Sequence, residues 1–358
     1  MWNHTEVTRQ LKIQYPIIQA PMAGSTTPEL VSAVSNGGGL GSIGAGYYSP
    51  EKLAEDIRNT KAITDQPFSV NLFVPEYNEV TSTQIDRMKE ILTPYYEEFN
   101  IEPDMPTIDK DDTFDQLVQI IIDENIKICS FTFGIPDPVT VKKLKKAGVT
   151  LIGCATTVDE AILNEQAGMD MVVAQGFEAG GHRGSFVQTA LRSSVGTMSL
   201  VPQIKDKVTI PVIAAGGIMD GRGLYAGLKL GADAAQMGTA FLTTKESAAP
   251  KIHKEAILNS TEADTVLTRS FSGKYARGIR NRFIDEMDWH QEDILPYPFQ
   301  NQMTKKIRSK AAAEGKSDIL HLWSGQSVRL SRDVEAGELL MDIVNQVNKI
   351  LRNENYHK

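Results

Sequence analysis

Short runs of apolar residues recur eight times between Pro16 and Phe241, and a segment with the spacing of a helix follows each run. Most of these runs are continuously apolar instead of alternating with polar residues, which is typical of strands that are buried on both faces. The pattern therefore predicts eight strands of a parallel sheet. They are Pro16–Pro21, Gly39–Gly44, Phe68–Phe73, Ile126–Phe133, Thr150–Ala155, Met171–Gly176, Pro211–Gly217 and Ala234–Phe241.

Polar start and stop signals frame the helices predicted between these strands. Thr27 precedes a Pro-Glu pair, as an N-cap residue does, and Ser49 repeats the arrangement. Gly168 and Gly231 stand where two further helices should end. Strands that alternate with helices predict an α/β fold, the (β/α)8 TIM barrel. The alternative is an open doubly wound sheet, but the eight units and the lack of a GxGxxG motif after the first strand favour the barrel.

Two regions fall outside the repeat. We predict a barrel domain over residues 1–258, with an insertion at about 74–112 that forms a helix and loop on the catalytic side. Residues 259–358 are predicted to form a C-terminal extension of helices and loops that covers the barrel as a lid. The tail from Asp333 to Arg352 has the pattern of an amphipathic helix, which would pack on the barrel or on a partner subunit of a homo-oligomer.

Charge and composition exclude several classes of protein. The formal net charge is -8, which argues against nucleic acid or an anionic membrane as a partner. No apolar run approaches the ~20 residues of a membrane span, and the N-terminus lacks the apolar core of a signal peptide. The two cysteines lie within apolar runs and have no companion ligands, so they predict core thiols and no metal site. A cytoplasmic enzyme is the expectation.

Glycine-rich turns follow the last two predicted strands. In barrels of this kind, the loops after strands seven and eight often bind phosphate. Gly216-Gly217 and Gly238-Thr239 stand at these two strand ends. Glycine lets the backbone approach an oxyanion closely, so the pair predicts a phosphate site, although either turn alone could simply be a tight turn. The phosphate does not identify the molecule that carries it.

His182 is the best candidate for proton transfer. Of the six histidines, it alone lies in a predicted strand-end loop, Phe177–Gly184, between glycines that would expose its ring. An imidazole can accept or donate a proton near neutral pH. A histidine that is hydrogen-bonded within the loop is the alternative. Glu178 and Arg183, in the same loop, are weaker candidates that could form a loop ion pair.

Several long segments are similar to those of a known family. They are PIIQAPMAGSTTPELVSAVSNGGGLGSIGAG from Pro16, QGFEAGGHRG from Gln175, PVIAAGGIMDGRG from Pro211 and QMGTAF from Gln236, followed by SGKYARGIRNRF from Ser272 and HLWSGQS from His321. With these motifs in this order, the chain resembles the nitronate monooxygenase family, formerly called 2-nitropropane dioxygenases, and most closely its class I branch. The resemblance extends over about Ile13 to Leu330.

The resemblance implies an FMN-containing barrel that oxidises alkyl nitronates, such as the toxic propionate 3-nitronate, with O2. It implies that His182 is the active-site histidine. The residues that would contact FMN are Met22, Asn71, Gln175, Gly180, Gly217, Gln236, Met237, Gly238 and Thr239. One departure affects the expected substrate: where class I relatives often carry a second histidine, this chain has Thr132, which can hydrogen-bond but cannot act as a base near pH 7.

Two other activities remain open on the sequence. Related FMN barrels reduce quinones or the enoyl groups of acyl carriers with NAD(P)H. A barrel without a flavin that acts on a sugar phosphate is the more distant alternative, but such an enzyme usually needs a catalytic lysine or paired carboxylates at the strand ends, and none is found there.

Overall fold

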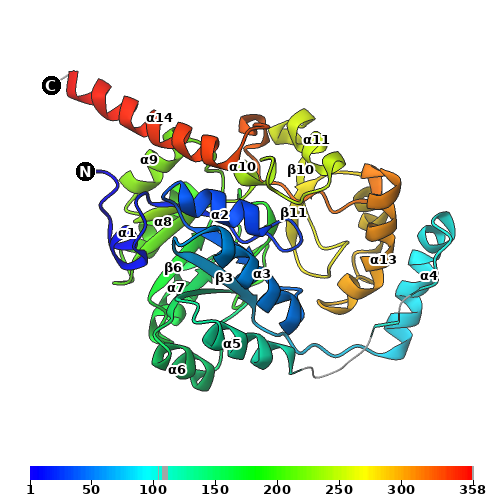
Figure 1. The fold of residues 1–358 in the computed structure, drawn as a ribbon. Coiled ribbons are helices and arrows are strands. Elements are labelled where there is room, and N and C mark those ends of the chain that lie inside the picture. The colour runs from blue at the N-terminus through cyan, green and yellow to red at the C-terminus, as the bar shows by residue number, and fades with distance from the viewer. Residues whose placement is uncertain (104, 107–111, 357–358) are drawn as a thin grey trace.

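The computed structural model describes residues 1–103, 105–106 and 112–356. Eight parallel strands form one sheet that curls into a barrel, with the order β1-β9-β8-β6-β5-β4-β3-β2 (Figure 1). This confirms the predicted (β/α)8 barrel. The strands are β1 (Ile17–Gln19), β2 (Gly41–Gly44), β3 (Phe68–Phe73), β4 (Ile128–Thr132), β5 (Thr150–Ala155), β6 (Met171–Gln175), β8 (Val212–Ala215) and β9 (Ala234–Met237).

Backbone hydrogen bonds close the barrel between its first and second strands. Leu40 N–H donates to the Ile17 carbonyl, and Gln19 N–H donates to the Leu40 carbonyl, each over 2.9 Å. All eight predicted strands are present. The eighth is shorter than predicted, because β9 ends at Met237 and the helix α10 (Thr239–Leu242) begins where the strand was expected to continue. Apolar composition alone did not separate a buried strand from the buried helix that follows it.

The polar signals read from the sequence cap the helices as predicted. The side chain of Thr27 accepts a hydrogen bond from the Leu30 N–H, and Ser49 accepts one from the Lys52 N–H. The remaining helices are α1 (Glu6–Leu11), α2 (Pro28–Asn36), α3 (Pro50–Ile63), α4 (Ser82–Glu98), α5 (Thr113–Asp123), α6 (Pro138–Lys146), α7 (Val158–Gln166), α8 (Thr197–Lys205), α9 (Gly221–Lys229), α11 (Lys251–Asn259), α12 (Arg282–Met287), α13 (Phe299–Glu314) and α14 (Ala336–Tyr356).

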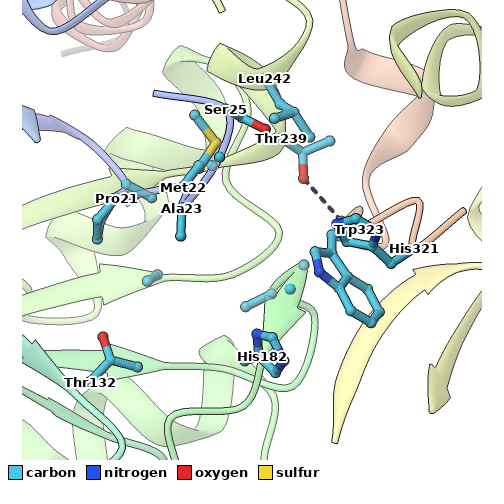
Figure 2. A pocket seen from close by; sticks show the side chains of 18 of the residues that line it. Pro21, Met22, Ala23, Ser25, Thr132, His182, Thr239, Leu242, His321 and Trp323 are labelled. Carbon is cyan, nitrogen blue, oxygen red and sulfur yellow. Dashed lines mark hydrogen bonds between the residues drawn. The ribbon is translucent and has the colours of Figure 1, made fainter. Parts of the chain in front are cut away.

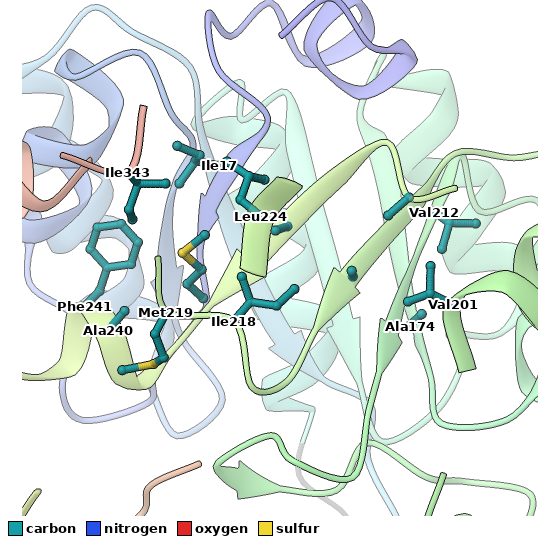
Figure 3. Packing of buried hydrophobic residues seen from close by; sticks show 14 of the residues in the cluster. Ile17, Ala174, Val201, Val212, Ile218, Met219, Leu224, Ala240, Phe241 and Ile343 are labelled. Carbon is teal, nitrogen blue, oxygen red and sulfur yellow. The ribbon is translucent and has the colours of Figure 1, made fainter. Parts of the chain in front are cut away.

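The last helix, α14, packs on the outside of the barrel against α2 and α9 (Figure 1). Its buried face includes Leu340 and Ile343, which belong to the same core cluster as Ile17 of β1 and Phe241 of α10 (Figure 3). Burial of each such side chain contributes about 1.5–3 kcal/mol. The amphipathic tail predicted for this region thus packs on its own barrel. The division of the chain at residue 258 stays a prediction.

A second, smaller sheet lies outside the barrel and was not predicted. It has the order β10-β11-β7 and joins β7 (Gly181–His182) to β10 (Thr265–Thr268) and β11 (Ala276–Ile279). Helix α4, from the predicted insertion, packs against α13, and the Tyr96 hydroxyl donates a 2.9 Å hydrogen bond to the Met303 carbonyl. Residues 104 and 107–111 of that insertion lie outside the described residues.

In the described ranges, none of the helices combines the length and the apolar character needed to cross a membrane. Within the same ranges, no group of three or more His, Cys, Asp or Glu side chains is placed to hold a metal ion.

Candidate functional site

A cavity of about 490 Å³ opens at the carboxyl ends of the barrel strands. Its barrel side is formed by the loops after the strands, and its other side by α13 and the segment before α14. Figure 2 shows Met22 and Thr132 on the barrel side and His321 and Trp323 on the other, with His182 between them. A pocket of this size and position suits a ligand as large as a cofactor.

The structure brings nearly all of the predicted site residues to this cavity. His182 lines it, together with eight of the nine residues expected to contact the cofactor: Met22, Asn71, Gln175, Gly180, Gly217, Gln236, Gly238 and Thr239. Met237 does not line it, because its side chain is buried in the barrel core. The stretch from Gln236 to Thr239 thus reaches the cavity at three of its four positions.

The two glycine turns offer backbone donors to the cavity. Gly217 has φ +73°, a left-handed conformation that suits glycine. Among the described residues, neither the Gly217 N–H nor the Gly238 N–H has a hydrogen-bond acceptor. The Thr239 hydroxyl accepts a 2.9 Å hydrogen bond from the Gly325 N–H, and the Ser327 hydroxyl donates over 3.0 Å to the Gly217 carbonyl. Two unused N–H groups at adjacent strand ends fit an oxyanion.

Three amide side chains on the barrel side of the cavity have different roles. Gln175 uses both ends of its amide: Nε2 donates to the His182 carbonyl over 3.0 Å, and Oε1 accepts from the Gly184 N–H over 2.8 Å. Asn71 donates to the hydroxyls of Ser130 and Thr132. Gln236 makes no side-chain hydrogen bond within the described part of the protein, so its amide is free for a ligand. Gln175 holds the loop that carries His182.

His182 is held between the barrel and the C-terminal segment. It lies on β7, where it pairs with Ala276 of β11, and its Nε2 atom lies 2.8 Å from Oγ of Ser272. The rings of Phe133 and Trp323 flank its ring, with centroids 5.5 and 5.4 Å away. Burial, and then the positive charges of Lys274 and Arg308, lower the pKa of His182 to about 3. His182 is therefore neutral near pH 7, with a lone pair on one of its ring nitrogens.

Thr132 and its neighbour form the barrel wall that faces His182. The Thr132 hydroxyl lies within hydrogen-bond distance of the Asn71 amide, which donates to it over 3.2 Å. Phe133 adopts a φ of +74°, which is rare and strained for a bulky residue. This conformation places its ring edge-on to His182, while the Nζ atom of Lys274 lies 4.5 Å from its centroid.

Arg308, on α13, brings a positive charge to the cavity. Its Nη2 atom donates to the carbonyl and side-chain oxygens of Asn301, and its Nε donates to Thr304. Within the described residues, no carboxylate pairs with Arg308, whereas Lys274 forms a salt bridge with Glu76. Burial lowers the pKa of Arg308 to about 10, which leaves it charged near pH 7. A half-buried cation with no carboxylate partner in the described structure fits an anionic ligand.

Sequence reasoning missed the cavity residues that lie far along the chain from the barrel strands. They are Ser272, Arg308, His253, His321, Trp323, Gly325 and Ser327. The motifs SGKYARGIRNRF and HLWSGQS were noted as similar to a family signature, but nothing in them shows which strand end they approach. On α13, Asn301, Lys305, Arg308 and Ala312 recur at helical spacing on the face that lines the cavity, a pattern that could have indicated a lining helix.

The chain is similar to proteins of one known family along nearly its whole length. A family model described as nitronate monooxygenase matches residues 4–346. A probable nitronate monooxygenase from Staphylococcus aureus (strain MRSA252) is 52% identical over 353 residues, which cover 98% of this chain and 99% of the relative. A protein of the same description from Staphylococcus haemolyticus (strain JCSC1435) has the same identity and coverage.

Two solved structures are similar to this chain along nearly its whole length. The nitroalkane oxidase from Streptomyces ansochromogenes superposes with a TM-score of 0.90 at 37% identity, covering 96% of this chain and 98% of that one. FabK from Thermotoga maritima gives a TM-score of 0.77 at 31% identity and covers 99% of each chain. These relatives show that the chain is an oxidoreductase with the (β/α)8-barrel fold.

Proposed function

Because the chain belongs to the nitronate monooxygenase family, we propose that it binds FMN and oxidises alkyl nitronates with O2 to carbonyl compounds and nitrite. Detoxification of compounds such as propionate 3-nitronate, in the cytoplasm, is the role we infer. The observation that carries the proposal is one cavity that contains unused backbone N–H groups at Gly217 and Gly238 and a neutral histidine, His182.

The residues at the cavity fit FMN. The N–H groups of Gly217 and Gly238, with the hydroxyl of Thr239, would hold its phosphate. The unengaged amide of Gln236 would meet a polar edge of the ring system, and Met22 would give it an apolar contact. When bound, FMN would supply the electron transfer and the reaction with O2, which no side chain here can perform.

The protein's own part is to bind the anion and to move a proton. A nitronate has already lost its proton and needs only to be held in the cavity, where Arg308 supplies a positive charge for an anionic group of the substrate. A neutral nitroalkane must first lose a proton from carbon, and His182 is the base at hand. The rings of Phe133 and Trp323 limit the water around His182.

The test begins with the colour of the purified protein. We expect a yellow protein that releases FMN on denaturation, because the unused N–H groups of Gly217 and Gly238 suit its phosphate. In air, it should form nitrite from propionate 3-nitronate. A colourless protein that cannot be loaded with FMN, or a flavoprotein that forms no nitrite from any nitronate, would exclude the proposed activity.

A reductase is the second candidate, because FabK from Thermotoga maritima shares the fold across the whole chain. Anaerobic mixing with NADH or NADPH separates the two activities. Rapid bleaching of the flavin would support the reductase, whereas a flavin that NAD(P)H leaves oxidised but a nitronate reduces would support the monooxygenase. A quinone and an enoyl thioester should then be tested as acceptors.

A barrel enzyme that acts on a sugar phosphate without a flavin is less consistent with the site. Such chemistry usually needs a lysine or paired carboxylates at the strand ends. Of the described residues that line the cavity, Glu178 is the only acid, and its carboxylate accepts hydrogen bonds from Thr197 at the start of α8. The only lysine among them, Lys305, lies on α13 and not at a strand end.

A further inference from the structure

The contact between His182 and Ser272 joins two segments that are 90 positions apart. Ser272 is 2% exposed, and its Oγ atom takes part in three hydrogen bonds. It lies 2.8 Å from Nε2 of His182, donates over 3.1 Å to the Lys274 carbonyl, and accepts over 3.3 Å from the Lys274 N–H. A serine hydroxyl has one proton, so it can act as donor in only one of these contacts.

Counting donors assigns that proton. Within the described structure, the Lys274 carbonyl receives no hydrogen bond other than the one from Ser272. If Ser272 donated to His182 instead, this carbonyl would lose its partner, which costs free energy in a partly buried place. The arrangement that satisfies every group has Ser272 donating to Lys274, and Nε2–H of His182 donating to Ser272.

The other ring nitrogen is then the one available for chemistry. Nδ1 of His182 makes no hydrogen bond to any described residue, and it is not enclosed by protein. Nδ1 of His321, by contrast, is both buried and without a partner. His182 lines the cavity, and Figure 2 shows its ring pointing into it.

We propose that Ser272 is a positioning residue that holds His182 in the tautomer protonated at Nε2, so that Nδ1 accepts the proton from the substrate. The tautomer follows from this chain's own contacts, while its catalytic use rests on the proposed function. In that use, the C–H bond of a neutral nitroalkane breaks, an N–H bond forms at Nδ1, and the electron pair stays on the nitronate. The imidazolium keeps its bond to Ser272, so the ring need not turn during the transfer.

The groups around the ring agree with this assignment. The charged side chains that face His182 are Lys274 and Arg308, both positive, and Phe133 and Trp323 cover the ring with carbon. None of these neighbours is a carboxylate, so none can accept a hydrogen bond from a protonated Nδ1. An aromatic wall on either side and a single hydroxyl at Nε2 leave Ser272 as the group that selects the tautomer.

Nuclear magnetic resonance of the flavin-loaded protein tests the tautomer without any turnover. Histidine labelled with ¹⁵N distinguishes a protonated ring nitrogen from a bare one, and loss of one signal set in His182→Asn identifies His182. We expect Nε2 protonated and Nδ1 bare at pH 7. Ser272→Ala should mix the two tautomers, and Ser272→Thr, which keeps the hydroxyl, should restore the single one. A wild-type ring protonated at Nδ1, or a ring that Ser272→Ala leaves unchanged, would overturn the proposal.

Kinetics then test the use of that tautomer. Ser272→Ala should lower kcat for neutral nitroethane about 10- to 100-fold, part of the contribution of a general base, and change turnover of ethyl nitronate less than about threefold. Ser270→Ala is the matched control, since Ser270 is equally buried but bonds to Thr268. Equal losses on both substrates would refute the positioning role. If the wild-type protein turns over neither substrate, the proposed function fails, while the resonance result still decides the tautomer.

Discussion

The Gly325 N–H donates a 2.9 Å hydrogen bond to the side-chain oxygen of Thr239, across 86 positions of sequence. This bond ties the segment before α14 to the turn after β9 (Figure 2). A Cβ atom on Gly180 would lie 2.5 Å from the Gly325 nitrogen, so the loop after β6 meets the same segment without room for a side chain. Three segments that are distant in sequence therefore meet at the proposed phosphate site: the loop after β6, the turn after β9 and the segment before α14.

Thr239→Val should weaken FMN binding. The substitution keeps the shape but removes the hydroxyl that accepts from Gly325 and faces the cavity. Loss of hydrogen bonding at a charged group costs about 1.5–3 kcal/mol, so we expect the Kd to rise about 10- to 100-fold in a fluorescence titration of FMN. Thr243→Val is the control, because the Thr243 hydroxyl donates to Arg332 instead. An unchanged Kd in Thr239→Val would place the phosphate elsewhere.

Gly217→Ala should lower both stability and FMN affinity. Its φ is +73°, and an added Cβ would lie 3.3 Å from Cβ of Glu178. Gly315, at the end of α13, has a nearly equal φ of +70° but open space around it, so Gly315→Ala measures the backbone strain alone. Both variants should lose about 1 kcal/mol in chemical unfolding, and only Gly217→Ala should bind FMN more weakly. Equal FMN affinities would mean that Gly217 serves the turn and not the phosphate.

Most of the fold could be predicted from local pattern. The eight strands and the caps at Thr27 and Ser49 depend on neighbours within a few positions, which the sequence displays directly. The small sheet could not be predicted in the same way. Its strand β7 has only two residues and forms because β11 lies beside it. A pairing between segments that far apart has no local signature.

The site residues also fall into two groups, those that local sequence predicts and those that it does not. Gly217 and His182 could be predicted because barrel topology places strand ends at one face, so their positions in the sequence imply their positions in space. Arg308 and Ser272 could not, because the segment after β9 has no repeat that fixes its path. Met237 differs from its neighbours, which face the cavity, because strand alternation turns its side chain into the core; its contact with FMN stays a prediction.

Arg308→Met should reduce selectivity for a carboxylated substrate. Arg308 has hydrogen-bond partners but no carboxylate partner within the described structure, so we expect it to bind the carboxylate of propionate 3-nitronate. The variant should lose about 10- to 100-fold in kcat/KM for that substrate and less than about threefold for propyl nitronate. Lys310→Met, on the same helix but outside the cavity, controls for net charge. Equal losses on both nitronates would show that Arg308 binds the nitronate group itself.

His182→Asn should separate the two kinds of substrate. A neutral nitroalkane needs a base, so its turnover should fall by about 10²- to 10⁴-fold. A nitronate needs only to be held, and an asparagine can still donate a hydrogen bond, so nitrite formation from ethyl nitronate should fall much less. Steady-state rates on both substrates at one pH make the comparison. Equal damage to both would reject the role of His182 as a base.

Acid should destabilise the protein through its buried histidines. Burial lowers the pKa of His253 to about 4 and that of His182 to about 3, against 6.5 for an ordinary histidine. The unfolded chain therefore binds more protons than the native one between about pH 4 and 6.5, and stability rises with pH in this window and is lost as pH falls through it. Carboxyl groups with a lowered pKa, such as Glu165, titrate lower still in the native state, so the range from pH 5 to 6.5 belongs mainly to the histidines.

Chemical unfolding across that range should show this slope, and His253→Gln should reduce it by about one proton near pH 5 and about half a proton near pH 6.5. The glutamine amide can replace the His253 Nε2 as the hydrogen-bond partner of the Trp323 carbonyl, 3.0 Å away, so the change removes the titration with little change in packing. A slope that is the same in His253→Gln as in the wild type would mean that His253 does not stay neutral in the folded protein. A stability independent of pH from 5 to 6.5 would contradict the lowered pKa of His182, His253 and His321, all of which burial lowers.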